Sequence, residues 1–135
     1  ASRLAVDLIP HHYLKQQETL PVENLHRALI EANNEIYRRG QANIEFRSMG
    51  TTTSALILVP EGAFCAHVGD SRIYHLRNQH LEQWTFDHSL VWEMQAAAGS
   101  NEESLKAGLI PKNVITRSLG PNASVLIDLE GPIPY

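Results

Sequence analysis

The aspartates of this sequence have the clearest potential for chemistry, and Asp70 has the most informative position among them. Asp70 lies in a polar corner, Gly69-Asp70-Ser71-Arg72, that follows the apolar run from Ala63 to Val68. A carboxylate at the end of a buried strand is held by a rigid sheet, as many binding and catalytic groups are. Gly, Asp and Ser also form plain turns, so the local sequence by itself favours a hairpin turn over a functional carboxylate.

Two pairs of adjacent side chains are weaker candidates. Asp87 and His88 could act as an acid–base pair, but neighbouring residues rarely bond each other productively. We therefore expect local capping, with Ser89 or Asp87 at the start of a short helix. His11 and His12 point to different faces of a helix, whereas two metal ligands need one face, so we expect solvated or capping side chains.

The patterns of several common sites are missing from the sequence. It has no Cys/His cluster with zinc spacing, no Gly-x-Ser-x-Gly elbow, and no Gly-Lys-Ser/Thr phosphate loop after Gly50. Hard cations need several oxygen ligands, and no two aspartates are close in sequence. The single cysteine, Cys65, lies in an apolar run and fits a small core residue of a reducing, cytoplasmic setting. Residue types alone therefore do not reach a reaction.

The composition is that of an ordinary globular protein, and 135 residues suffice for one domain with a core. The net charge of −4, without a basic stripe among aromatic residues, gives no support for nucleic-acid binding. No apolar run approaches the roughly 20 residues of a membrane span, so we expect no membrane partner either.

Two helices are expected to begin the chain. Residues 1–15 carry an apolar helical face, and Pro10 should kink or break that helix because it lacks a backbone donor. The clearest helix runs from Pro21 to Arg39, with Gly40 as the residue that ends it. Its apolar stripe, which should pack on a sheet, consists of Val22, Leu25, Leu29, Ala32 and Ile36.

The middle of the chain predicts four successive strands. They cover residues 51–59, 63–68, 73–77 and 80–84, and short turns should join them into an antiparallel meander. Short helices are expected over residues 89–98 and 100–106, and further strands over residues 113–119 and 125–129. The fold class is therefore α+β, with helices packed on antiparallel sheet.

Several phrases taken together are more specific than any one of them. They are Ala-Ser-Arg-Leu-Ala-Val, Met-Gly-Thr-Thr, Ala-His-Val-Gly-Asp-Ser-Arg-Ile-Tyr, Leu-Glu-Gln-Trp-Thr-Phe-Asp-His-Ser and Asn-Val-Ile-Thr-Arg-Ser-Leu-Gly. In this order and spacing they resemble the type-2C, or PPM, metal-dependent serine/threonine protein phosphatases, the bacterial branch in particular. The resemblance covers nearly the whole chain.

The resemblance implies an α-β-β-α sandwich of two antiparallel sheets flanked by helices. It implies hydrolysis of phosphoserine and phosphothreonine in proteins by a water held between two Mg²⁺ or Mn²⁺ ions. By the same resemblance Asp70 would help to bind a third, weaker metal beside that pair. The segment at about residues 89–113 would be the flap that lies over the site and influences substrate choice.

The family's other metal carboxylates have no counterpart in this sequence. They belong to an Asp-Gly motif expected before Ala1, a Ser-Asp-Gly motif expected soon after Tyr135, and a further aspartate near the family's C-terminus. We therefore expect residues 1–135 to be a single partial domain, cut at both ends and inactive by itself. The alternative is a pseudophosphatase or phosphatase-like binding module, and a sigma-factor-regulating phosphatase is a weaker third possibility.

Overall fold

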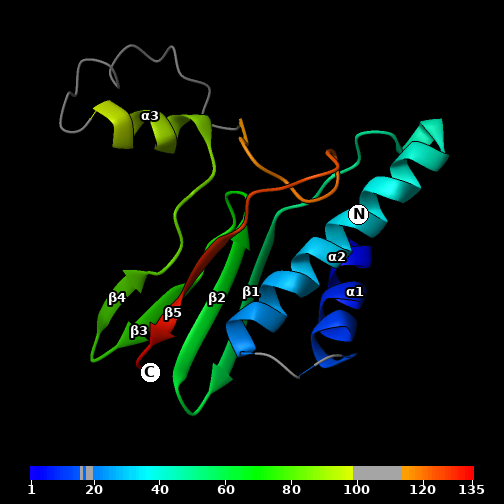
Figure 1. Ribbon diagram of the computed structural model, residues 1–135. Coiled ribbons are helices and arrows are strands. Elements are labelled where there is room, and N and C mark those ends of the chain that lie inside the picture. Colours follow the sequence, from blue (N-terminus) through cyan, green and yellow to red (C-terminus); the bar gives the residue numbers. More distant parts are fainter. Residues whose placement is uncertain (16, 18–19, 99–113) are drawn as a thin grey trace.

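The computed structural model describes residues 1–15, 17, 20–98 and 114–135, and it combines helices with two antiparallel sheets (Figure 1). This confirms the expected α+β class. The elements in chain order are α1 (Ser2–Lys15), α2 (Pro21–Ala42), the 3-10 helix η1 (Ile44–Phe46), β1 (Thr53–Val59), β2 (Gly62–Val68), β3 (Tyr74–Arg77), β4 (His80–Gln83), α3 (Leu90–Ala98) and β5 (Asp128–Ile133).

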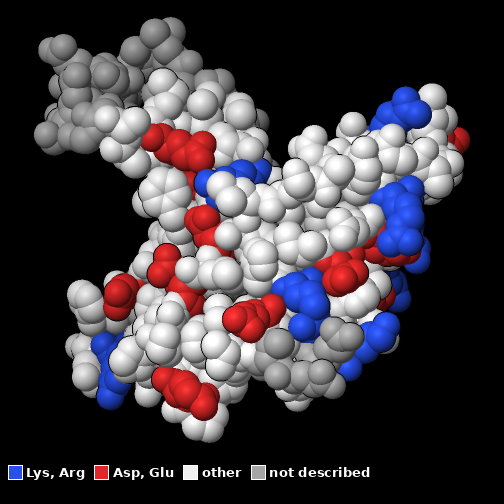
Figure 2. Space-filling model, viewed as in Figure 1, with Lys and Arg blue, Asp and Glu red and all other residues white. Residues whose placement is uncertain are grey.

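Helices α1 and α2 lie together on one face of the three-stranded sheet (Figure 1). The predicted stripe of α2 is confirmed, since Leu25, Leu29, Ala32 and Ile36 are buried in the core and Val22 packs against it. No helix in the described part of the chain is both long and apolar enough to cross a membrane. On the face shown in Figure 2, Lys and Arg side chains gather along α1 and α2, and acidic ones are spread over the sheets and the base of α3.

Two expected helix ends were wrong. Helix α1 does not break at Pro10, and both Pro10 and Val6 are exposed, so water can satisfy the Val6 carbonyl that the proline leaves without a donor. A kink at Pro10, the other expected outcome, stays a prediction. Helix α2 continues through Gly40 to Ala42 instead of stopping before the glycine. A Cβ at Gly40 would lie 2.9 Å from the Phe46 carbonyl oxygen, so the glycine permits close packing of η1 on the helix.

Strand β2 is the centre of the larger sheet, and every one of its residues is buried. It pairs antiparallel with β1 from Thr53↔Val68 to Val59↔Gly62, and on its other edge with β5. The predicted four-strand meander was therefore wrong, because β3 and β4 form a separate two-stranded sheet. A short apolar run specifies a buried strand but not its neighbours, and the strand beside β2 comes from the far end of the chain.

The predicted hairpin of β3 and β4 is confirmed, with Asn78 and Gln79 at positive φ in its two-residue turn. The last two predicted strands were misplaced. Within residues 114–119 only isolated bridges form, Thr51↔Leu119 and Ser89↔Ile115, and the final strand begins at Asp128. Helix α3 lies where a short helix was expected, whereas residues 99–113, including the second expected helix and most of the expected flap, lie outside the described residues.

Candidate functional site

The corner Gly69–Arg72 leaves the C-terminal end of β2, on the side of the molecule where α3 lies (Figure 1). It is not the hairpin turn that the local sequence favours, because it leads from one sheet to the other. Gly69 has a φ of 111°, and a Cβ there would lie 2.5 Å from Cγ2 of Thr52, so both backbone and space require glycine. The corner therefore has one defined shape, and Asp70 follows directly on this glycine.

His88 holds the start of the corner through both backbone groups of Gly69. The Gly69 N–H donates to His88 Nδ1 at 2.9 Å, and the His88 N–H donates to the Gly69 carbonyl at 2.8 Å. Because Nδ1 accepts a hydrogen bond, the neutral ring carries its proton on Nε2, which donates to Asp128 Oδ2 at 2.7 Å. The His88 side chain is completely buried, so its tautomer and orientation are fixed from both sides.

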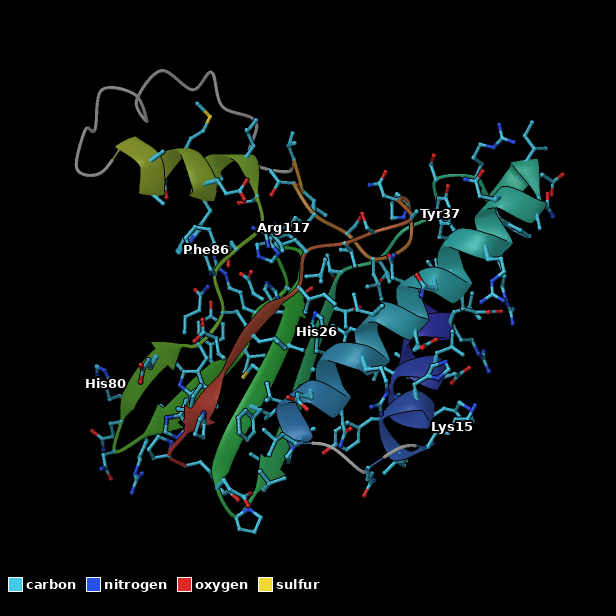
Figure 3. The ribbon with its side chains drawn as sticks, in the orientation of Figure 1. Lys15, His26, Tyr37, His80, Phe86 and Arg117 are labelled. Atoms are coloured by element: carbon cyan, nitrogen blue, oxygen red, sulfur yellow. The ribbon has the colours of Figure 1, made fainter. Side chains whose placement is uncertain are left out.

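Asp128 connects this histidine to Arg117, whose Nη1 donates to Asp128 Oδ1 at 3.0 Å. Arg117 is labelled in Figure 3, near the C-terminal end of β2. Burial raises the pKa of Asp128, but the hydrogen bonds from His88 and Arg117 outweigh it, so the pKa lies below its usual value. The carboxylate is therefore ionised and occupied by two donors.

His67 lies beside this network on β2, opposite Asp128 in the register of β5. Its ring centroid is 5.0 Å from that of His88, and its Nδ1 lies 2.8 Å from Ser54 Oγ. Burial lowers the pKa of His67, which keeps the ring neutral beside its histidine neighbour. Cys65, on the same strand, is buried as expected, and burial raises the pKa of its thiol to about 11.

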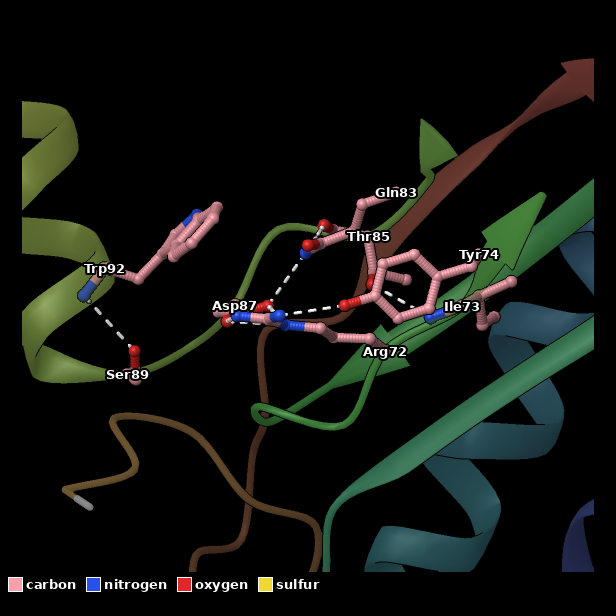
Figure 4. Close-up of polar contacts among 8 residues, drawn as sticks. All are labelled: Arg72, Ile73, Tyr74, Gln83, Thr85, Asp87, Ser89 and Trp92. Carbon is pink, nitrogen blue, oxygen red and sulfur yellow. Dashed lines mark hydrogen bonds and ion pairs between the residues drawn. The ribbon is translucent and has the colours of Figure 1, made fainter. Parts of the chain in front are cut away.

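Arg72 holds the other end of the corner (Figure 4). Its Nε lies 2.9 and 3.0 Å from the two oxygens of Asp87, and its Nη2 lies 2.5 Å from Oδ2. Its Nη1 donates to the Tyr74 hydroxyl at 2.8 Å, and Gln83 Nε2 donates to Asp87 Oδ1 at 2.9 Å. The hydrogen bonds to Asp87 and Tyr74 raise the pKa of Arg72, so the guanidinium is permanently charged.

Each residue of the segment Asp87-His88-Ser89 therefore has a separate role. Of the two predicted caps, Ser89 and Asp87, Ser89 is the one that caps the helix, since its Oγ accepts from the Trp92 N–H at 3.2 Å (Figure 4). The expectation that Asp87 and His88 also cap locally was wrong. Their partners Arg72 and Asp128 are 15 and 40 residues away in sequence, and no local pattern reports such distant contacts.

Asp70 differs from the other two carboxylates of the site. It is half-buried and has no hydrogen-bond or ion-pair partner within the described residues, whereas Asp87 and Asp128 are each engaged by an arginine. A carboxylate of this kind suits a hard cation such as Mg²⁺ or Mn²⁺ as one oxygen ligand. The described residues hold no group of three or more His, Cys, Asp or Glu side chains that could bind a metal. Asp70 therefore fits as a single contributor, not as a complete site.

Comparison with known proteins agrees with this geometry. Residues 1–92 match the model of the protein phosphatase 2C family. A putative protein phosphatase 2C-type of Streptococcus pyogenes is 40% identical over 105 residues, 78% of this chain and 42% of that protein. The serine/threonine phosphatase stp of Listeria monocytogenes is 34% identical over 133 residues, 95% of this chain and 52% of its own length.

The fold is similar to that of solved phosphatases as well. The crystal structure of serine/threonine phosphatase Stp1 from Staphylococcus aureus superimposes with a TM-score of 0.81 at 29% identity, covering 96% of this chain and 52% of that one. The chain spans about half the length of the curated relatives it matches. With two thirds of its residues matched to the family model and its fold shared, the chain belongs to the protein phosphatase 2C family.

Proposed function

We propose that this chain is the central part of a serine/threonine protein phosphatase that depends on Mg²⁺ or Mn²⁺. The observation that carries the proposal is Asp70, a carboxylate without a partner in the described structure, on a corner that other residues hold in shape. The relatives named as serine/threonine phosphatases support the same reading, and they suggest proteins carrying phosphoserine or phosphothreonine as substrates.

Asp70 would hold one metal ion, and residues outside this chain would supply the remaining ligands. Divalent metals in such a site lower the pKa of a bound water and neutralise phosphate charge. Residues of this chain would fix the position of the Asp70 carboxylate. His88 fixes the backbone of Gly69, and Arg72 fixes the far end of the corner, so the Asp70 carboxylate is presented with little conformational freedom.

The first test compares the complete protein with the 135-residue chain, using p-nitrophenyl phosphate in the presence of Mn²⁺. We expect turnover by the complete protein and none by the chain alone, because one carboxylate cannot hold a metal pair. Robust turnover by the chain would show that it contains a whole metal site. A complete protein that binds phosphoprotein but never hydrolyses it would instead establish a phosphatase-like binding module.

The second test asks whether Asp70 is a metal ligand, with Asp70→Ala in the complete protein and the exposed Asp7→Ala on α1 as the matched control. The expected result is a weaker Mn²⁺ dependence at high metal concentration for Asp70→Ala, with the tightly bound metals retained. Calorimetric titration with Mn²⁺ measures both. Equal titration curves for the two variants, or loss of every metal from Asp70→Ala, would contradict the proposed role.

A further inference from the structure

We propose that Arg72 is a positioning residue that holds helix α3 in a fixed orientation beside the Asp70 corner. Arg72 belongs to the corner itself, two residues after Asp70, and its guanidinium reaches the segment that leads into α3. It contacts that segment twice, through the carboxylate of Asp87 and through the indole of Trp92 (Figure 4). Arg72 therefore links the corner both to the segment before α3 and to the helix itself.

The contact with Trp92 is the part that concerns the helix. The Arg72 guanidinium carbon lies 5.2 Å from the centroid of the Trp92 ring, within the range of a cation–π interaction. Phe86 packs edge-on against the same indole, with ring centroids 6.2 Å apart. Trp92 is thus held between a residue of the corner and a residue of the preceding segment, and it lies in the first turn of α3.

Within the described residues, the other restraints on α3 lie at its start. Ser89 caps the helix, the Leu90 N–H donates to the Val114 carbonyl at 2.9 Å, and Ser89 bridges to Ile115. In Figure 1 the rest of α3 stands apart from both sheets. The backbone bonds at Ser89 and Leu90 fix where the helix begins. The Trp92 indole adds a second point of contact in the same first turn, to a residue of the corner, and two points of contact restrict the direction of the helix.

The chemistry of the contact requires arginine. The guanidinium makes a forked bond to Asp87 and donates to Tyr74 through its N–H groups, and its central carbon lies over the Trp92 indole. A lysine ammonium is a point charge without a fork or a flat face, so it can replace the charge but not the set of contacts. This difference separates positioning from a general electrostatic effect.

The consequence for activity rests on the proposed phosphatase function. Helix α3 lies beside the corner that carries Asp70, and two apolar residues of this region are exposed, Met94 by 42% and Phe86 by 41%. A peptide around a phosphorylated residue extends beyond the metal site, whereas p-nitrophenyl phosphate does not. Loss of the fixed orientation of α3 should therefore raise KM for the peptide and leave KM for the small substrate unchanged.

The experiment uses the complete protein with Arg72→Gln and Arg72→Lys, and the exposed Arg77→Gln on β3 as the matched control. For Arg72→Gln we expect KM for a phosphothreonine peptide to rise roughly tenfold and KM for p-nitrophenyl phosphate to stay within about twofold of the original. Any fall in kcat, from a less firmly held Asp70, should be equal on the two substrates. Arg72→Lys should restore little of the loss, and Arg77→Gln should change neither constant. An unchanged peptide KM, an equal rise of KM on both substrates, or full rescue by lysine would overturn the proposal.

A second readout does not depend on catalysis. In a Trp84→Phe background Trp92 becomes the only tryptophan of this chain, since the sequence has two. If the complete protein has further tryptophans, they are replaced in the same background. We expect Arg72→Gln to shift Trp92 emission to longer wavelength and to increase its quenching by acrylamide, with the melting temperature of each variant recorded as a folding control. Unchanged Trp92 emission and quenching in a folded Arg72→Gln variant would refute the contact.

The two readouts separate the failure of this inference from the failure of the proposed function. If the protein has no phosphatase activity but Arg72→Gln changes the emission of Trp92, the positioning role stands and the enzymatic assignment is lost. If the protein is an active phosphatase but Arg72→Gln changes neither its peptide KM nor its Trp92 emission, the enzymatic assignment stands and the positioning role is excluded.

Discussion

Replacing His88 by alanine should be among the most damaging single substitutions in the described structure. The imidazole is completely buried, accepts a hydrogen bond from the Gly69 N–H at 2.9 Å and donates one to Asp128 at 2.7 Å. Its removal leaves a buried N–H unpaired at a cost of about 1–3 kcal/mol, and the lost bond to a carboxylate costs about 1.5–3 kcal/mol. The free energy of unfolding should therefore fall by about 3–5 kcal/mol.

Urea denaturation followed by tryptophan fluorescence measures this loss, and the exposed His80→Ala on β4 is the matched control. The control should change the free energy of unfolding by less than about 0.5 kcal/mol. A double-mutant cycle with Asp128→Asn should show coupling of about 1 kcal/mol or more, because the two side chains share a hydrogen bond. A loss of less than about 1 kcal/mol for His88→Ala, or additive effects in the cycle, would refute the reasoning.

Three further outcomes are expected. Gly69→Ala should lower the free energy of unfolding by about 2 kcal/mol or more in urea denaturation, because the φ of Gly69 is 111° and a Cβ there would collide with Thr52. An unchanged urea midpoint of unfolding would show that the corner can rearrange. Asn33→Ala should cost about 2–3 kcal/mol by the same measurement, because the buried Asn33 Oδ1 accepts from the Gly120 N–H at 2.7 Å, and the exposed Asn34→Ala should be neutral. Burial lowers the pKa of His67 in the folded state. Below pH about 6.5 the unfolded chain therefore binds a proton at His67 that the folded chain does not bind, so the free energy of unfolding falls as pH decreases towards the folded-state pKa. Melting temperatures between pH 7.5 and 5.5 should show this slope, and His67→Gln should flatten it; equal slopes would exclude His67 as its source.

Much of the fold could be predicted because it depends on local patterns. The stripe of α2 follows from apolar residues at helical spacing, β2 from an uninterrupted apolar run, and the β3–β4 hairpin from a two-residue turn. The order of phrases around Gly69–Arg72 likewise indicated the family that the comparison then showed. These features need only residues that are close in sequence.

The pairing of strands was beyond such reasoning. β2 pairs with β5, which lies some 60 residues later, and the chain leaves the sheet at the very corner that looked like a hairpin turn. The free energy that selects β5 comes from burying both faces and both edges of β2, and this is a property of the assembled sheet. No alternation of residues within β2 records which strand will lie beside it.

The sequence by itself determined that Asp70 is a carboxylate at the end of a buried strand, and that Asp87, His88 and Ser89 precede a helix. Only the tertiary structure decided what these residues do. It brings Arg72 to Asp87, Asp128 to His88 and Trp92 to Arg72, leaving Asp70 without a partner among the described residues. The physical reason is that a hydrogen bond depends on distances of about 3 Å in space, and residues 15 to 40 positions apart reach that distance only after the sheets have formed.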